Sequence, residues 1–143
     1  MAFPYKTILC PVHFDDNALP VLIKAAEIAR HFQASVILVH VVPFALSLGE
    51  APPPWGLEAE EKAAKAKLTA LAEQTLDGLK RELLIYTGDV ITGILDAQEK
   101  YQADLVVMAT HGRRGLARMI LGSVAAAVVR KAACPVLTIR EGA

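Results

Sequence analysis

The sequence has few cysteines, no net charge and no long apolar run, and each of these absences excludes a class of protein. Cys10 and Cys134 are the only cysteines among 143 residues, and they lie at opposite ends of the expected sheet, so we expect buried, inert thiols rather than a disulfide framework. The 15 basic and 15 acidic residues cancel, which gives no indication of nucleic acid or a membrane surface as a partner. Although 54% of the residues are apolar, no apolar run approaches the roughly 18 residues that span a bilayer.

The N-terminal residues enter a strand-like run almost at once. They show no charged region, apolar region and cleavage site of a signal peptide, so a cytoplasmic location is expected. The length predicts one domain over residues 1–143.

Short apolar runs and longer segments with helical spacing alternate along the chain. Strands are expected at 6–12, 35–42, 83–88, 104–110 and 135–140, and helices at 17–32, 58–76, 89–101 and 122–132. Because these strands are apolar at nearly every position, they are expected to be buried on both faces, as in a parallel sheet covered by helices. The fold class is therefore α/β, with a doubly wound sheet. Asp16 or Asn17 is a candidate N-cap for the first helix, and Asp89 for the third.

The segment SLGEAPPPWG, residues 47–56, carries three consecutive prolines and the only tryptophan. This composition predicts neither helix nor central strand. Two readings stay open, an exposed connection and a lid over the ligand cleft anchored by Trp55.

The residues that follow the fourth apolar run have the composition of a phosphate site. Ligands of doubly wound sheets bind beyond the carboxyl ends of the strands, and here Gly112 and Gly115 allow positive φ angles close to a ligand. Gly122 and Ser123 then open a helix whose first N–H groups have no partner within the helix and favour an anion. Arg113, Arg114 and Arg118 can add positive charge. The simpler alternative is a glycine turn followed by a serine-capped helix.

With these motifs the sequence resembles the universal stress protein family, whose nucleotide-binding members carry Gly-x2-Gly-x9-Gly-(Ser/Thr) at this place. Here Ala109 to Gly112 is followed by nine residues and then by Gly122-Ser123, and ILCPV, VHVV, GDV and CPVLTIR extend the resemblance over essentially the whole chain. It implies a Rossmann-like fold of the adenine nucleotide alpha hydrolase type, strand order 3-2-1-4-5, and a homodimer formed through the last strand, Val136–Arg140. It also implies binding of ATP or a related adenine nucleotide with Mg²⁺. The nucleotide-binding residues that it implies are Pro11, Val12, His13, Val41, Ala109, His111, Gly112, Arg113, Gly115, Gly122, Ser123 and Val124.

Two positions depart from the family pattern. His13 stands where ATP-binding members usually have an acidic residue, so the two-acceptor contact of a carboxylate with the ribose is lost. Asp15 or Asp16 is a possible substitute, although both also fit the role of N-cap. Ala109 replaces the first glycine of the motif, which costs about 1 kcal/mol if that position needs a positive φ and nothing if it is simply the last strand residue.

Three functions remain open at this point. The first is nucleotide binding without efficient turnover, since no strong catalytic acid/base pair is found near the glycines. The second is a dimeric interaction module that has lost its nucleotide affinity, which His13 and Ala109 favour. The third is a zinc site made by His13, His40 and His111, which all lie near the carboxyl ends of expected strands.

Overall fold

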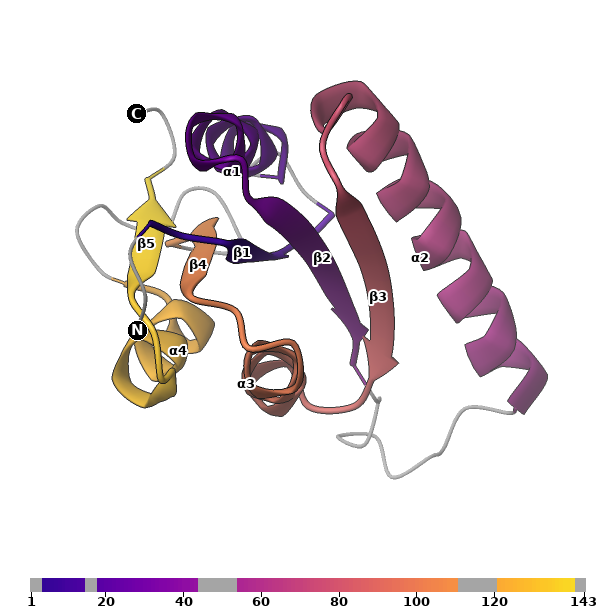
Figure 1. Cartoon of the computed structure of the whole chain (residues 1–143). Helices are drawn as coiled ribbons and strands as arrows, with labels where there is room; N and C mark the ends of the chain where they lie inside the picture. The colour runs from indigo at the N-terminus through magenta and orange to yellow at the C-terminus, as the bar shows by residue number, and fades with distance from the viewer. Residues whose placement is uncertain (1–3, 15–17, 44–53, 111–120, 141–143) are drawn as a thin grey trace.

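A computed structural model of the chain describes residues 4–14, 18–43, 54–110 and 121–140, with the backbone alone for 54–57. Figure 1 shows how its strands and helices alternate along the chain. In chain order they are β1 (Thr7–Pro11), α1 (Ala18–Phe32), β2 (Ser35–Val42), α2 (Pro54–Thr75), β3 (Arg81–Thr87), α3 (Val90–Lys100), β4 (Leu105–Ala109), α4 (Ser123–Lys131) and β5 (Val136–Ile139).

The strands form a parallel sheet in the order β3-β2-β1-β4-β5. Chain order reverses between β1 and β4, where Ile8 lies beside Leu105 and Leu9 beside Val106. The fold class and the strand order implied by the resemblance are both confirmed.

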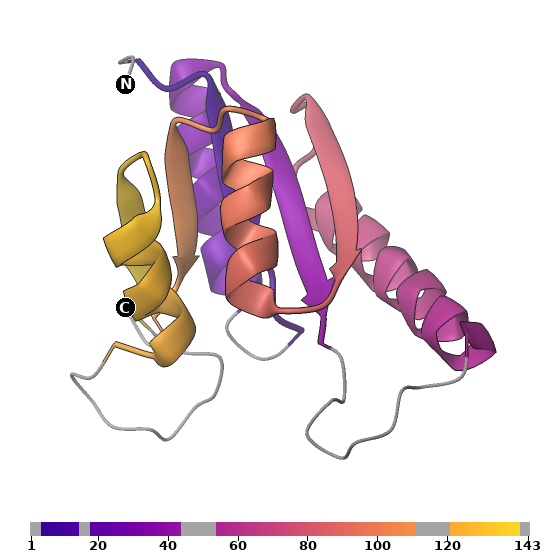
Figure 2. The same cartoon turned by 90° about the horizontal axis from the view of Figure 1, so that it is seen from below.

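Two apolar layers cover the two faces of this sheet, with α1 and α2 on one side and α3 and α4 on the other (Figures 1 and 2). Successive residues of a strand alternate between these layers. Ile8 and Cys10 of β1 face α1 and α2, whereas Leu9 between them faces α3 and α4. All three are fully buried, which explains why the central strands are apolar at nearly every position.

The second helix begins earlier than the sequence predicted. The structure places Pro54, Trp55 and Gly56 within α2, so the expectation that residues 47–56 hold no helix is wrong for these three. Pro54 is the first residue of the helix, a position that needs no N–H donor and that suits the fixed φ of proline. The side chain of Trp55 and residues 47–53 lie outside the description, which leaves the proposed lid untested.

Smaller differences concern the sheet edge and the thiols. β3 begins at Arg81 rather than at residue 83, because its first two side chains are exposed and give no apolar signal. Cys10 is buried as expected, and burial raises the pKa of its thiol to about 12. The expectation of burial is wrong for Cys134, which is only partly buried. Both cysteines are free.

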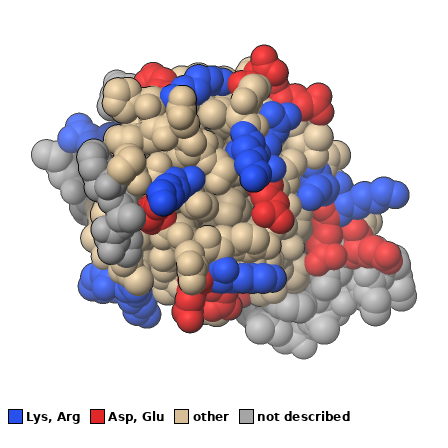
Figure 3. Space-filling view, viewed as in Figure 1, with Lys and Arg blue, Asp and Glu red and all other residues tan. Residues whose placement is uncertain are grey.

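The charged side chains are mixed in sign over the surface. Figure 3 shows acidic and basic groups interspersed on one face, in keeping with the formal net charge of zero. Within the described ranges, no helix is both long and apolar enough to cross a membrane.

Candidate functional site

The candidate site lies where the carboxyl ends of β1 and β4 meet, at the lower edge of the sheet in Figure 2. The helix that follows β1 packs on one face of the sheet, and the helix that follows β4 packs on the other. Such a reversal beyond the carboxyl ends of the strands is the usual ligand position in doubly wound sheets.

The end of β1 is held firmly against β2. Pro11 is the last strand residue, and the N–H of Val12 donates to the carbonyl of Val39 at 2.8 Å. Val12 is buried with 6% of its surface exposed. His13, which follows it, is exposed. An exposed imidazole therefore stands at the position where the family pattern has a carboxylate.

His40 makes a contact that sequence reasoning missed. Its Nδ1 lies 2.8 Å from the carbonyl oxygen of Val12, and its ring lies 4.2 Å from that of Phe14, centroid to centroid. Lys67 of α2 places its ammonium 5.5 Å from the Phe14 ring centroid. Burial is the main cause that lowers the pKa of His40 below its ordinary value of 6.5, and the nearby His13 and Lys67 lower it further.

A main-chain hydrogen bond holds the start of α4 to the residue that follows β4. Thr110, which is buried, donates its N–H to Ile139 at 3.1 Å and accepts the N–H of Gly122 through its carbonyl at 2.8 Å. Gly122 is the N-cap of α4, with φ −61° and ψ 159°, and makes no side-chain cap bond. The exposed Ser123 and partly buried Val124 follow in the first turn, where main-chain N–H groups have no acceptor within the helix. Thr110 was part of the quoted motif, yet nothing in the sequence marked its carbonyl as the anchor.

Ala109 does not strain the backbone. It is the last residue of β4, paired with Ile139, and it is not among the residues with positive φ. Of the two outcomes considered for this departure, the structure shows the harmless one as far as the backbone is concerned.

Val41 of β2 is buried, with its side chain in the layer beneath α3. It packs so closely on Gly93 that a Cβ added there would meet Val41 Cγ2 at 2.8 Å. Its apolar side chain serves the core, and only its main chain is available for a polar contact.

Several expected site residues fall outside the described residues, namely His111, Gly112, Arg113 and Gly115, together with Arg114, Arg118, Asp15 and Asp16. The glycine turn is thus untested, and so is the contribution of His111 to a zinc site. Among the residues that the structure does describe, no group of three or more His, Cys, Asp or Glu side chains could hold a metal ion.

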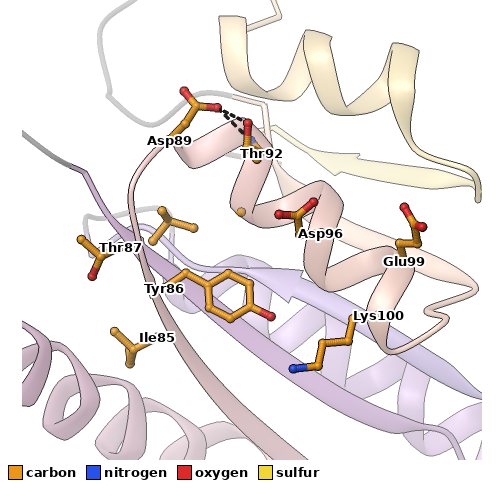
Figure 4. A pocket seen from close by; sticks show the side chains of 10 residues that line it. Ile85, Tyr86, Thr87, Asp89, Thr92, Asp96, Glu99 and Lys100 are labelled. Atoms are coloured by element: carbon orange, nitrogen blue, oxygen red, sulfur yellow. Dashed lines mark hydrogen bonds between the residues drawn. The ribbon is translucent and has the colours of Figure 1, made fainter.

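A separate groove of about 750 Å³ lies between β3 and α3 (Figure 4). Tyr86 lies along it, and Asp96, Glu99 and Lys100 line its far end. Asp89 caps α3 at its near end, where its carboxylate accepts the N–H and hydroxyl of Thr92 at 2.9 and 2.8 Å. The cap predicted at Asp89 is confirmed. Apart from Val41, none of the expected site residues that the structure describes lines this groove.

Comparison with known proteins identifies relatives along the whole chain. The model of the universal stress protein family matches residues 4–140. Universal stress protein MJ0531 of Methanocaldococcus jannaschii is 35% identical over 143 residues, covering 96% of this chain and 83% of that protein. The structure of MJ0577 from the same organism is 28% identical, covers 96% of each chain and has a TM-score of 0.80. A universal stress protein from Archaeoglobus fulgidus, solved in complex with dAMP, is 27% identical with a TM-score of 0.65, and the alignment covers 94% of this chain and 98% of that one.

Proposed function

The chain belongs to the universal stress protein family, and we propose that it binds an adenine nucleotide at the carboxyl ends of β1 and β4 without efficient turnover. The observation that carries this proposal is the hydrogen bond between Gly122 and Thr110, at 2.8 Å. It fixes the start of α4 against the end of β4, which makes the unpaired N–H groups of the first turn of α4 a suitable anion site there. The complex of the related Archaeoglobus protein with dAMP supports an adenine nucleotide as the ligand.

The phosphates are assigned to the first turn of α4. Gly122 has no side chain to keep an oxygen from the main chain, and Ser123 adds a hydroxyl. Together with the glycines at 112 and 115, this turn would hold the phosphates mostly by main-chain donors. The adenine is assigned to the main chain of Val41, and the ribose to the segment Pro11 to His13.

Mg²⁺ would accompany a triphosphate rather than bind to the protein first. The described residues at the ends of β1, β2 and β4 include no carboxylate, and hard divalent ions prefer oxygen ligands. When bound, the ion would neutralise phosphate charge. The hydroxyl oxygen of Ser123, at the start of α4, would be available to it.

Calorimetric titration of the protein with MgATP, AMP and dAMP tests this function, with Gly122→Val as the control. We expect the wild-type protein to release or absorb heat on binding nucleotide. This heat should disappear in the Gly122→Val variant, because the added side chain fills the space assigned to the phosphates. Binding that is unchanged in the variant would move the site away from α4. No heat with any of the three nucleotides would favour the second function. That function is a dimeric interaction module, in which the ribose contact was lost when His13 took the place of the carboxylate.

The proposed assembly is a homodimer paired through β5, and the two sheet edges support this choice because they differ. At the β3 edge, the ammonium of Lys65 of α2 donates to the carbonyl of Leu83 at 3.1 Å, and an edge covered by a neighbouring element and a charged side chain resists further pairing. At the β5 edge, Leu137 of the strand and Val129 of the adjoining α4 are large apolar residues with 38% and 46% of their surface exposed. A second copy would cover both.

The hydrogen bonds of β5 also show which groups would pair. Pro135 and Ile139 turn their carbonyls toward β4, where they accept from Val106 and Thr110. Main-chain groups alternate in direction along a strand, so those of Val136 and Thr138 point away from β4. These are the groups that an antiparallel strand of a second copy would bond across a twofold axis.

A further inference from the structure

Both main-chain polar groups of Val12 are bonded to consecutive residues of β2. The N–H donates to Val39 as part of the ladder, and the carbonyl contacts the side chain of His40, each at 2.8 Å. The second bond is unusual, because a side chain continues the ladder one step beyond the last residue of β1, Pro11. Val12 is therefore fixed more firmly than a residue just past a strand end normally is.

Chemistry determines which nitrogen of His40 carries the proton. A carbonyl oxygen only accepts hydrogen bonds, so Nδ1 must be the donor. The ring is further held by Phe14, at a centroid distance of 4.2 Å and an interplanar angle of 30°. Lys67 lies over the same Phe14 ring. Strand β2, segment 12–14 and helix α2 are thus connected through one stack of three side chains.

The bond to His40 sets the direction of the next peptide. The carbonyl of Val12 and the N–H of His13 belong to one planar trans peptide, in which they point in opposite directions. Because the carbonyl points toward β2, the N–H of His13 points toward the β4 side, where the order of the strands reverses. The side chain of His40 thereby controls a main-chain group at the candidate site that it does not itself reach.

We propose that His40 is a positioning residue of the nucleotide site, which orients the Val12–His13 peptide toward the ligand through its Nδ1–H. The inference rests on the proposed function for its ligand, but the orientation itself is a property of the chain without nucleotide. It also gives this chain, which has an imidazole instead of the carboxylate at position 13, a main-chain contact with the ribose end that does not depend on that side chain.

Two substitutions separate the hydrogen bond from the packing of the ring. His40→Phe keeps an aromatic ring against Phe14 and loses the donor, whereas His40→Asn loses the ring and keeps a donor at the position of Nδ1. Loss of one neutral hydrogen bond corresponds to a weakening of roughly 3- to 10-fold, so we expect this increase in the nucleotide Kd for His40→Phe and recovery of most of the affinity in His40→Asn. His31→Phe is the control, since His31 is an exposed histidine in the last turn of α1.

An NMR measurement tests the orientation without any nucleotide. We expect the ¹⁵N shifts of wild-type His40 to show a protonated Nδ1 and an unprotonated Nε2, and the amide shift of His13 to move in His40→Phe but little in His40→Asn. The opposite tautomer would overturn the inference, as would equal loss of affinity in both variants. If the wild-type protein binds no nucleotide while these shifts behave as expected, the proposed function fails and the orientation by His40 stands.

Discussion

The N–H of Gly122 donates to the carbonyl of Thr110 at 2.8 Å, and this bond joins the two ends of the connection between β4 and α4. Eleven residues separate the partners along the chain, from 111 to 121, so the bond closes the base of the segment that carries most of the expected phosphate contacts. The start of α4 is consequently fixed at the carboxyl end of β4.

Removal of this bond alone should loosen the start of α4. The φ of Gly122, −61°, fits proline, so Gly122→Pro deletes the N–H with little backbone strain while placing a ring carbon near the Thr110 oxygen. We expect the free energy of unfolding to fall by about 1–3 kcal/mol, from the lost bond and the unpaired carbonyl, measured by urea denaturation. Gly122→Ala retains the N–H and should lose about 1 kcal/mol or less. Equal losses in the two variants would show that the bond contributes nothing.

Substitution of Gly93 should reveal how tightly α3 packs on β2. A Cβ at this position would lie 2.8 Å from Cγ2 of Val41, and the buried valine has little room to move. Alanine gains about 1 kcal/mol of helix propensity over glycine, but overpacking costs typically 1–3 kcal/mol, so Gly93→Ala should be net destabilising in urea denaturation. In the Val41→Ala background the clash is absent and the same substitution should stabilise. An equal effect in both backgrounds would contradict the contact.

The stability of the protein should depend on pH through His40. Burial lowers the pKa of His40 in the folded protein below the ordinary value of 6.5, so between these two values the unfolded chain binds a proton that the folded chain does not. Stability is therefore unaffected above pH 6.5 and falls as the pH drops below it, until the folded pKa is passed. Lys67 and His13 act in the same direction, and the Val12 carbonyl opposes them.

Urea denaturation of wild type and His40→Asn between pH 4.5 and 7.5 measures this term. Other groups titrate in both proteins, so the difference between the two curves isolates His40. We expect the difference to be constant above pH 6.5 and to change below it in the direction that favours the variant. Parallel curves across the whole range would show that His40 titrates normally.

The sequence predicted the layers of the fold because burial on both faces leaves a direct signal. Ile8, Leu9 and Cys10 are consecutive and all fully buried. Successive residues of a strand face opposite sides of the sheet, so all three can be buried only where both sides are covered. The start of α2 was missed because proline ends helices in most positions, while the first turn, where Pro54 lies, is the exception. Arg81 and Glu82 gave no strand signal because they belong to an edge.

The candidate site was harder to predict than the fold. The motif located Gly122 and Ser123 correctly at the start of a helix, since a helix start follows from local residue types. The consequence of Ala109 depended on where β4 ends, and boundaries are poorly determined by local pattern. The contact between His40 and Val12 joins residues 28 positions apart and depends on strand register, which the composition of either segment does not contain.

The pairing of two copies through β5 can be tested by one main-chain atom. Thr138→Pro removes an N–H that points away from β4 and leaves untouched the bonds of Pro135 and Ile139 to β4, and proline is tolerated on an edge strand at such a position. We expect the wild-type protein to sediment as a dimer and Thr138→Pro as a folded monomer with unchanged far-UV circular dichroism. Thr138→Val keeps the N–H and should remain dimeric. A wild-type monomer would refute the assembly, and a dimeric Thr138→Pro would mean that the copies meet through another surface, because an antiparallel ladder cannot form around a missing central donor flanked by a proline ring.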